Sequence, residues 1–206
     1  VEFAGYFGVS AKELRSTLDE LGLAAPSAHV GLDFSSLDNM QSALSREIEY
    51  AQELGLQYII TPGSPVPSNP SLDDVTALIP FFEKASEMVR AAGMKYGYHN
   101  HDFEFKANED GVVPIDYLLE NTDPKYVNFQ MDLYCVTRAG ADPVAYFEKY
   151  PGRFKSWHVK DMDEECKFAP VGEGTIDFKR ILDQKETSGM MKYFVEQDQS
   201  WDKKPL

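Results

Sequence analysis

The chain has 206 residues, of which 43% are hydrophobic and 13% aromatic, and its formal net charge is -14. This length and composition exclude a disordered chain and predict one globular domain over residues 1–206, with a large buried core. The negative charge argues against nucleic acid or an anionic membrane as the main partner, because both attract basic surfaces. No run of 18 apolar residues occurs, so no membrane span is predicted.

The two cysteines indicate the compartment. Cys135 and Cys166 lie far apart and lack the short spacing of a thiolate metal site. Two scattered cysteines in a chain of this length predict a reduced compartment such as the cytoplasm, without a disulfide framework. The opening VEFAG reads as the middle of a fold, and no N-terminal targeting segment is visible.

Strand-like and helix-like stretches alternate along the whole chain. Strands are predicted at 1–5, 27–30, 57–61, 95–101, 127–134, 154–161 and 192–197. Helices are predicted between them at 10–21, 39–54, 71–92, 115–121, 143–149 and 178–184. Ser10 with Glu13 and Ser71 with Asp74 read as helix caps, Gly55 closes the second helix, and Pro80 is expected to kink or split the third. The tail WDKKPL ends without another helix.

Strict alternation of strands and helices predicts a parallel sheet with right-handed crossovers. Both an open doubly wound sheet and a TIM (β/α)8 barrel satisfy this rule. In an open sheet, ligands gather at one switch point, whereas here polar residues end at least five separate strands. The α/β fold class is therefore predicted to be a TIM barrel, whose active sites lie at the carboxyl ends of its strands.

Histidines and carboxylates mark these strand ends, namely His29, His99, His101, Asp132, His158 and Glu196. Side chains two residues apart share one face of a strand, so His158 lies with Ser156 and Lys160, opposite Trp157 and Val159. A single histidine at a strand end is more often a hydrogen-bonding residue than a ligand. Asp132, His158 and Glu196 together, on the inner face of three strands, favour a site for Mn²⁺, Mg²⁺, Co²⁺ or Zn²⁺.

Six sequence motifs carry a resemblance to a known family: VEFAG, YHNHDFEF, MDLYCVTRAGADP, WHVKDMD, VGEGTIDF and YFVEQDQ. In this order they resemble the sugar phosphate isomerase/epimerase group of the xylose isomerase-like TIM barrels, the superfamily that includes AP endonucleases and inosose dehydratases. The resemblance implies a divalent metal at the mouth of the barrel. It also implies that VEFAG is the second strand, so that the first strand and helix and the last helix are lacking from this chain.

The family's usual metal ligands are Glu, Asp, His and Glu from four strands. Asp132, His158 and Glu196 match the last three, but His99 stands where ketose epimerases keep the first glutamate. Either His99 is itself a ligand or Glu104, a few residues further on, reaches back. Glu104 is slightly favoured because it preserves the negative charge of the site.

The resemblance implies a metal-dependent isomerase or epimerase that moves a proton next to the carbonyl of a small sugar or sugar derivative. Glu196 and His99 are the expected acid–base pair. Lys160 is expected to stabilise an enolate or hold a substrate oxygen or phosphate, with a salt bridge to a neighbouring carboxylate as the alternative. The expected contacts to substrate hydroxyls are His29, His101 and Glu2. Gly172–Gly174 is too short for a phosphate cradle and reads as a loop over the mouth.

Three other functions compete with this one. A lyase or hydrolase acting on a 3-keto-sugar, a keto-glycoside or an inosose is favoured by the missing first glutamate. An AP endonuclease needs more histidines and a basic surface, which this chain lacks. The third is a non-catalytic sugar-binding or assembly barrel. A homo-oligomer is compatible with the family, and nothing in the sequence specifies one.

Overall fold

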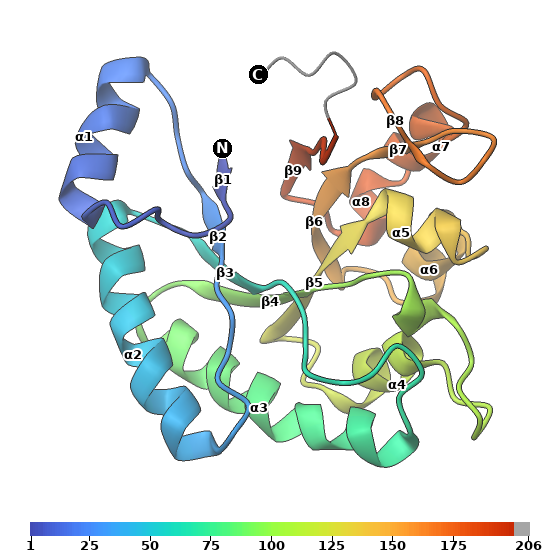
Figure 1. Ribbon diagram of the computed structural model, residues 1–206, viewed down its shortest axis with the longest axis horizontal. Helices are drawn as coiled ribbons and strands as arrows, with labels where there is room; N and C mark the ends of the chain where they lie inside the picture. The colour runs from blue at the N-terminus through green and yellow to red at the C-terminus, as the bar shows by residue number, and fades with distance from the viewer. Residues whose placement is uncertain (200–206) are drawn as a thin grey trace. The chain divides into compact units, whose positions relative to one another are not determined.

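A computed structural model describes residues 1–199 (Figure 1). Its contacts divide them into two compact units, one of residues 1–99 and 107–128, the other of 100–106 and 129–199. That residues 1–206 form a single domain stays a prediction. The expectation for the tail WDKKPL concerns residues 201–206, which lie outside the described residues. Among the described helices, none has the length and apolar character needed to cross a membrane.

The first unit is built on four parallel strands in the order β1 (Glu2–Phe3), β2 (Ser27–His29), β3 (Tyr58–Thr61) and β4 (Lys95–His99). They are connected by α1 (Ala11–Leu21), α2 (Leu37–Leu54) and α3 (Leu72–Ala91), and α4 (Pro114–Asn121) follows β4. Figure 1 shows α1, α2 and α3 following one another beside these strands. Because the strands are parallel, their carboxyl ends lie at one edge of the sheet.

Serine caps set where the helices of this unit begin. The Ser71 side chain accepts the Asp74 N–H, and the Asp74 side chain accepts the Ser71 N–H, which confirms the predicted cap. Ser36 caps α2, which therefore begins at Leu37 rather than at residue 39. Pro80 lies inside α3 without splitting it. Its ring is exposed, so the backbone carbonyl that loses its N–H partner can bind water.

The second unit contains the end of β5 (Val127–Asp132), followed in the sheet by β6 (Phe154–Val159) and β9 (Lys192–Val195), again parallel. Its helical segments are η1 (Phe103–Phe105), α5 (Leu133–Arg138), α6 (Pro143–Lys149), α7 (Phe178–Leu182) and α8 (Lys185–Ser188). A short antiparallel hairpin, β7 (Asp161–Met162) with β8 (Phe168–Ala169), follows β6.

All predicted strands except β3 end one or two residues earlier than expected, among them β4 at His99, β5 at Asp132 and β9 at Val195. For β5 the reason is local. The Asp132 carboxylate accepts the Cys135 N–H at 2.8 Å and caps α5, which starts on the next residue. Leu133 and Tyr134, predicted as the end of the strand, therefore begin the helix α5 (Leu133–Arg138), which was not predicted.

The predicted two faces of β6 are confirmed. Trp157 is fully buried and stacks on Phe147 of α6, with ring centroids 5.0 Å apart and planes at 3°. His158, on the opposite face, instead contacts Glu196. The apolar face of β6 is thus covered by a helix, while its polar face belongs to the candidate site.

Candidate metal and catalytic centre

Three strand-end side chains of the second unit come together. Asp132 is the last residue of β5, His158 is its register partner on β6, and Glu196 directly follows β9. One ligand atom from each lies within 4.8 Å of those of the other two. Asp132 and His158 are buried, at 1% and 4% exposure, whereas the Glu196 side chain is 32% exposed. Two of the three side chains are therefore buried, and Glu196 is the one that solvent reaches.

Hydrogen bonds fix the three groups. His158 Nδ1 lies 2.8 Å from Glu196 Oε2, and the Glu196 N–H donates to the Val159 carbonyl at 3.1 Å. The Asp132 N–H donates to Asn100 Oδ1 at 3.3 Å. Burial raises the pKa of the Asp132 carboxyl above its ordinary value, although the Cys135 N–H and the charge of Lys160 oppose that rise. A cation in this cluster would relieve the cost of burying Asp132 as an anion.

Lys160 joins the same cluster through three carboxylates. Its Nζ lies 3.3 Å from Glu196 Oε2 and 3.9 Å from Asp132 Oδ2, and it donates a hydrogen bond to Asp198. Burial would lower the pKa of Lys160, but the bond to Asp198 and the charges of Asp132 and Glu196 outweigh burial and raise it. The ammonium therefore stays charged at neutral pH. His158 and Lys160 both contact Glu196, as expected for residues on one face, and the salt bridge considered as the alternative role of Lys160 is present.

Two aromatic rings and one acid complete the surroundings of Lys160. Its Nζ lies 4.6 Å from the Phe168 ring centroid and 5.7 Å from that of Tyr134. Neither contact was predicted, because Phe168 belongs to the β7–β8 hairpin and Tyr134 to α5, and neither element was predicted. Asp198 was also missed, although it lies two residues after Glu196 and alternation along the strand would have put both on one face.

His101 and Glu104 also belong to the second unit. Glu104 lies in η1, is 1% exposed and accepts the His101 N–H at 2.9 Å. The His101 ring is half-exposed, with Nδ1 4.0 Å from Glu104 Oε1. Glu104 is outside the group of three whose ligand atoms lie within 4.8 Å. Its role as the fourth ligand stays a prediction.

The remaining predicted residues belong to strands of the first unit, with His29 and His99 the last residues of β2 and β4 and Glu2 the first residue of β1. His29 Nε2 is 3.2 Å from Glu2 Oε2, and the His29 and His99 ring centroids are 5.0 Å apart. Ser27 donates to Glu2 Oε1 at 2.5 Å. Three residues expected to touch substrate or move protons are thus neighbours within their own unit, and Ser27 holds one of them, Glu2.

The Gly172–Gly174 loop is held by a buried carboxylate. Asp161, 1% exposed, accepts the Gly172 and Gly174 N–H groups on Oδ2 at 2.9 and 3.0 Å. Its Oδ1 accepts the N–H groups of Met162 and Ile176 at 2.8 and 3.3 Å. Four hydrogen bonds satisfy a buried anion here and hold the loop against β7.

Substituting Gly174 tests this anchor. A Cβ at Gly174 would lie 2.3 Å from Asp161 Oδ1 and 2.5 Å from the Met162 carbonyl oxygen. G174A is therefore expected to lower the free energy of unfolding by about 1–3 kcal/mol, measured by urea denaturation. The control G31A, where a Cβ meets nothing within 4 Å, should change it by less than about 0.5 kcal/mol. Equal effects of the two variants would contradict a tight anchor.

A scan against known families matches residues 3–196 to the model described as xylose isomerase-like TIM barrel. The chain is similar to an inosose dehydratase of Lacticaseibacillus casei, 30% identical over 135 residues, covering 57% of the chain and 44% of that relative. The chain thus spans less than half of this curated relative.

Two solved structures are informative. A sugar phosphate isomerase/epimerase from Parabacteroides distasonis is 27% identical, with a TM-score of 0.86, over 97% of this chain and 73% of that one. IOLI protein with a bound zinc atom shares only 11% identity at a TM-score of 0.68, over 91% of this chain and 73% of that one, which shows a common fold alone. With nearly all of its described residues matched by the family model, the chain belongs to the xylose isomerase-like TIM barrel family and has the barrel fold predicted from its sequence.

Proposed function

We propose that Asp132, His158 and Glu196 bind a divalent metal ion, and that this centre moves a proton next to the ketone of a small polyhydroxylated substrate. The observation that carries the proposal is the convergence of these three ligand atoms within 4.8 Å at strand ends of one unit. The relatives named as isomerase/epimerase and as inosose dehydratase support the same reaction class, because both reactions can begin with removal of a proton beside a carbonyl.

The donor set fits such an ion. One imidazole and two carboxylates suit Mn²⁺, Mg²⁺, Co²⁺ or Zn²⁺. Ligands about 2.1 Å from one ion lie at most about 4.2 Å apart. The three ligand atoms all lie within 4.8 Å of one another, so small side-chain rotations suffice to bring them around one ion. We propose Glu104 as the fourth ligand, with His99 as the alternative. When bound, the ion would polarise the substrate carbonyl and make the neighbouring C–H more acidic.

The residues of this chain would then share the proton transfer. Glu196, the most exposed of the three, would take the proton from carbon, so that its negative charge passes to the substrate as an enolate. The charged Lys160 is placed to stabilise that oxyanion. His99 is proposed as the second acid–base group, with Glu2, His29 and His101 as contacts to substrate hydroxyls.

Two outcomes follow from one enolate. If the proton returns to carbon on the other face or at the neighbouring carbon, the reaction is an epimerisation or isomerisation. If the proton instead goes to a hydroxyl on the β carbon, that C–O bond breaks, water leaves and the reaction is a dehydration. The curated relative named inosose dehydratase specifically favours this second candidate.

Incubation with ketoses and inosose in D₂O distinguishes the two outcomes. Deuterium uptake at carbon is measured by NMR. If it occurs and the product keeps the mass of the substrate apart from the deuterium, the reaction is an epimerisation or isomerisation. A product lighter by one water indicates dehydration. Absence of both deuterium uptake and product with every ketone tested would contradict the proposed function.

Removal of divalent ions is expected to slow strongly the exchange of the substrate C–H proton with solvent. Dialysis against a chelator should lower the rate of deuterium uptake by at least about 100-fold, and Mn²⁺, Mg²⁺, Co²⁺ or Zn²⁺ should restore it, because carbonyl polarisation contributes several kcal/mol. Elemental analysis before and after dialysis should show loss of one ion per chain. An enzyme that keeps its full rate without bound metal would contradict the proposal.

A further inference from the structure

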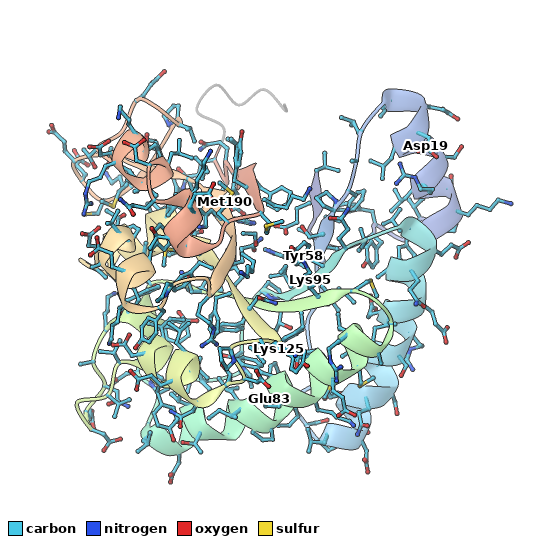
Figure 2. The ribbon with its side chains drawn as sticks, turned by 180° about the vertical axis from the view of Figure 1, so that it is seen from behind. Asp19, Tyr58, Glu83, Lys95, Lys125 and Met190 are labelled. Carbon is cyan, nitrogen blue, oxygen red and sulfur yellow. The ribbon has the colours of Figure 1, made fainter. Side chains whose placement is uncertain are left out.

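Asn100, which lies between the two histidines of the YHNH motif, has no role in the proposed function. It is 1% exposed and directly follows β4. Figure 2 shows the other end of that strand, where Lys95 lies beside Tyr58 at the start of β3, with its Nζ 3.4 Å from the Tyr58 hydroxyl. Asn100 is therefore a buried polar residue at the carboxyl end of a parallel strand, the end at which barrel enzymes build their sites.

Asn100 bonds to the end of β5 through both its backbone and its side chain. Its backbone N–H donates to the Gln130 carbonyl at 3.4 Å, and its side-chain Oδ1 accepts the Asp132 N–H at 3.3 Å. In a parallel ladder, the N–H and C=O of one residue bond to two residues of the neighbouring strand that lie two positions apart. Here the side-chain oxygen acts in place of the backbone C=O, so the carboxamide adds one bond to this pattern after β4 has ended.

The orientation of the Asn100 carboxamide follows from its partners. The Asp132 N–H is a donor, so the amide atom that faces it is the oxygen. The amide nitrogen, Nδ2, donates to the His101 carbonyl at 3.4 Å. A flipped amide would place two donors against each other at Asp132. The carboxamide thus connects the end of β5 to the turn that follows β4.

Asp132 is constrained at three points, and Asn100 supplies the first of them by accepting its backbone N–H. The Cys135 N–H donates to Asp132 Oδ1 at 2.8 Å, and Asp132 Oδ2 lies 3.9 Å from Lys160 Nζ. Oδ2 thus faces the ammonium group that also contacts Glu196. Without the side chain of Asn100, the backbone N–H of a 1%-exposed residue would lose this acceptor.

The turn that carries the proposed fourth ligand begins at the same residue. The His101 carbonyl accepts the Asn100 amide, and the His101 N–H donates to Glu104 Oε2 at 2.9 Å. Asn100 therefore lies between two proposed ligands, with Asp132 at the end of β5 on one side and Glu104 in η1 on the other.

From these contacts we infer that Asn100 is a positioning residue of the metal centre, because its carboxamide fixes the backbone of Asp132 and thereby the direction of one ligand. The inference rests on the proposed function for the ion itself, whereas the hydrogen bond to Asp132 can be tested without metal. Groups that orient metal ligands typically contribute about 10- to 100-fold to metal affinity.

The first test measures the hydrogen bond in the metal-free chain. N100L removes the acceptor at similar size, and hydrogen exchange of the Asp132 amide relative to that of Gln130, followed by NMR, should become about 5- to 10-fold faster, which corresponds to one ordinary hydrogen bond. N100D keeps an oxygen at the same position and should retain most of the protection. Unchanged exchange at Asp132 in N100L would overturn the inference.

N108L is the matched control for N100L. Asn108 is also buried, at 8% exposure, and its amide oxygen accepts the N–H groups of Asp110 and Val112 at 3.0 and 2.9 Å within the first unit. N108L should lower the melting temperature, as N100L does, but leave the relative exchange rate of the Asp132 amide unchanged. Equal effects of the two variants at Asp132 would mean that Asn100 contributes only general stability, which would also overturn the inference.

The second test measures the consequence for the ion. Isothermal titration with Mn²⁺, at a temperature at which every variant is folded, should show an affinity about 10- to 100-fold lower in N100L and unchanged in N108L. Equal Mn²⁺ affinity in N100L and the unmodified chain would contradict a positioning role. If the unmodified chain bound no Mn²⁺, the proposed function would fail instead, and faster exchange in N100L would still show that Asn100 holds Asp132.

Discussion

Replacing Glu196 with glutamine (E196Q) is expected to lower kcat for deuterium exchange by about 10³- to 10⁴-fold. Glutamine keeps the size of the side chain but can neither take a proton nor offer a negatively charged ligand. The affinity for the divalent ion should fall as well, because one of the three converging ligand groups loses its charge. Isothermal titration with Mn²⁺ and NMR exchange rates measure the two effects separately.

The control for E196Q is E165Q, which removes a carboxylate whose side chain is 73% exposed. It should leave both the metal affinity and the exchange rate unchanged. If E196Q kept the full exchange rate, Glu196 would be neither the base nor a required ligand, and the proposed division of roles would be wrong.

The second large effect is expected for Lys160. K160M should lower kcat by about 10²- to 10³-fold, the usual loss when one stabilising group is removed from a developing oxyanion. Metal affinity should instead stay the same or rise. Lys160 Nζ lies 3.3 Å from Glu196 Oε2 and 3.9 Å from Asp132 Oδ2, so it competes electrostatically with an ion for both carboxylates.

These two readouts separate a catalytic lysine from a structural one. K160R, which keeps the charge, should recover part of the rate, and K167M, at a lysine whose side chain is 70% exposed, should behave like the unmodified chain. Loss of metal binding in K160M, together with loss of activity, would show that Lys160 only holds the carboxylates in place.

Strand alternation made much of the site predictable. The sequence places Asp132, His158 and Glu196 at three successive strand ends and on equivalent faces, and the structure brings these three together. The helix caps at Ser10 and Ser71 could also be predicted, because a capping side chain accepts a hydrogen bond from an N–H only three residues away. The barrel itself followed from strict alternation and polar strand ends.

What the sequence did not reveal depends on contacts between distant segments. Asp161 accepts hydrogen bonds from the Gly172 and Gly174 N–H groups, more than ten residues away. No local sequence pattern predicts such a partner. The β7–β8 hairpin has strands of two residues each, too short for any periodicity. The helix α5 was missed because it has only six residues, too few for a helical pattern, and the predicted strand ran two residues into it, to Tyr134.

The proposed function depends on one divalent ion held by Asp132, His158 and Glu196. A crystal structure of the chain soaked with Mn²⁺, with anomalous data collected at the manganese edge, measures this directly. We predict a single strong peak about 2.0–2.3 Å from one atom of each of these three side chains, with Glu104 or His99 completing the sphere. No peak at this position in a fully loaded crystal, or a peak bound by other residues, would contradict the central claim.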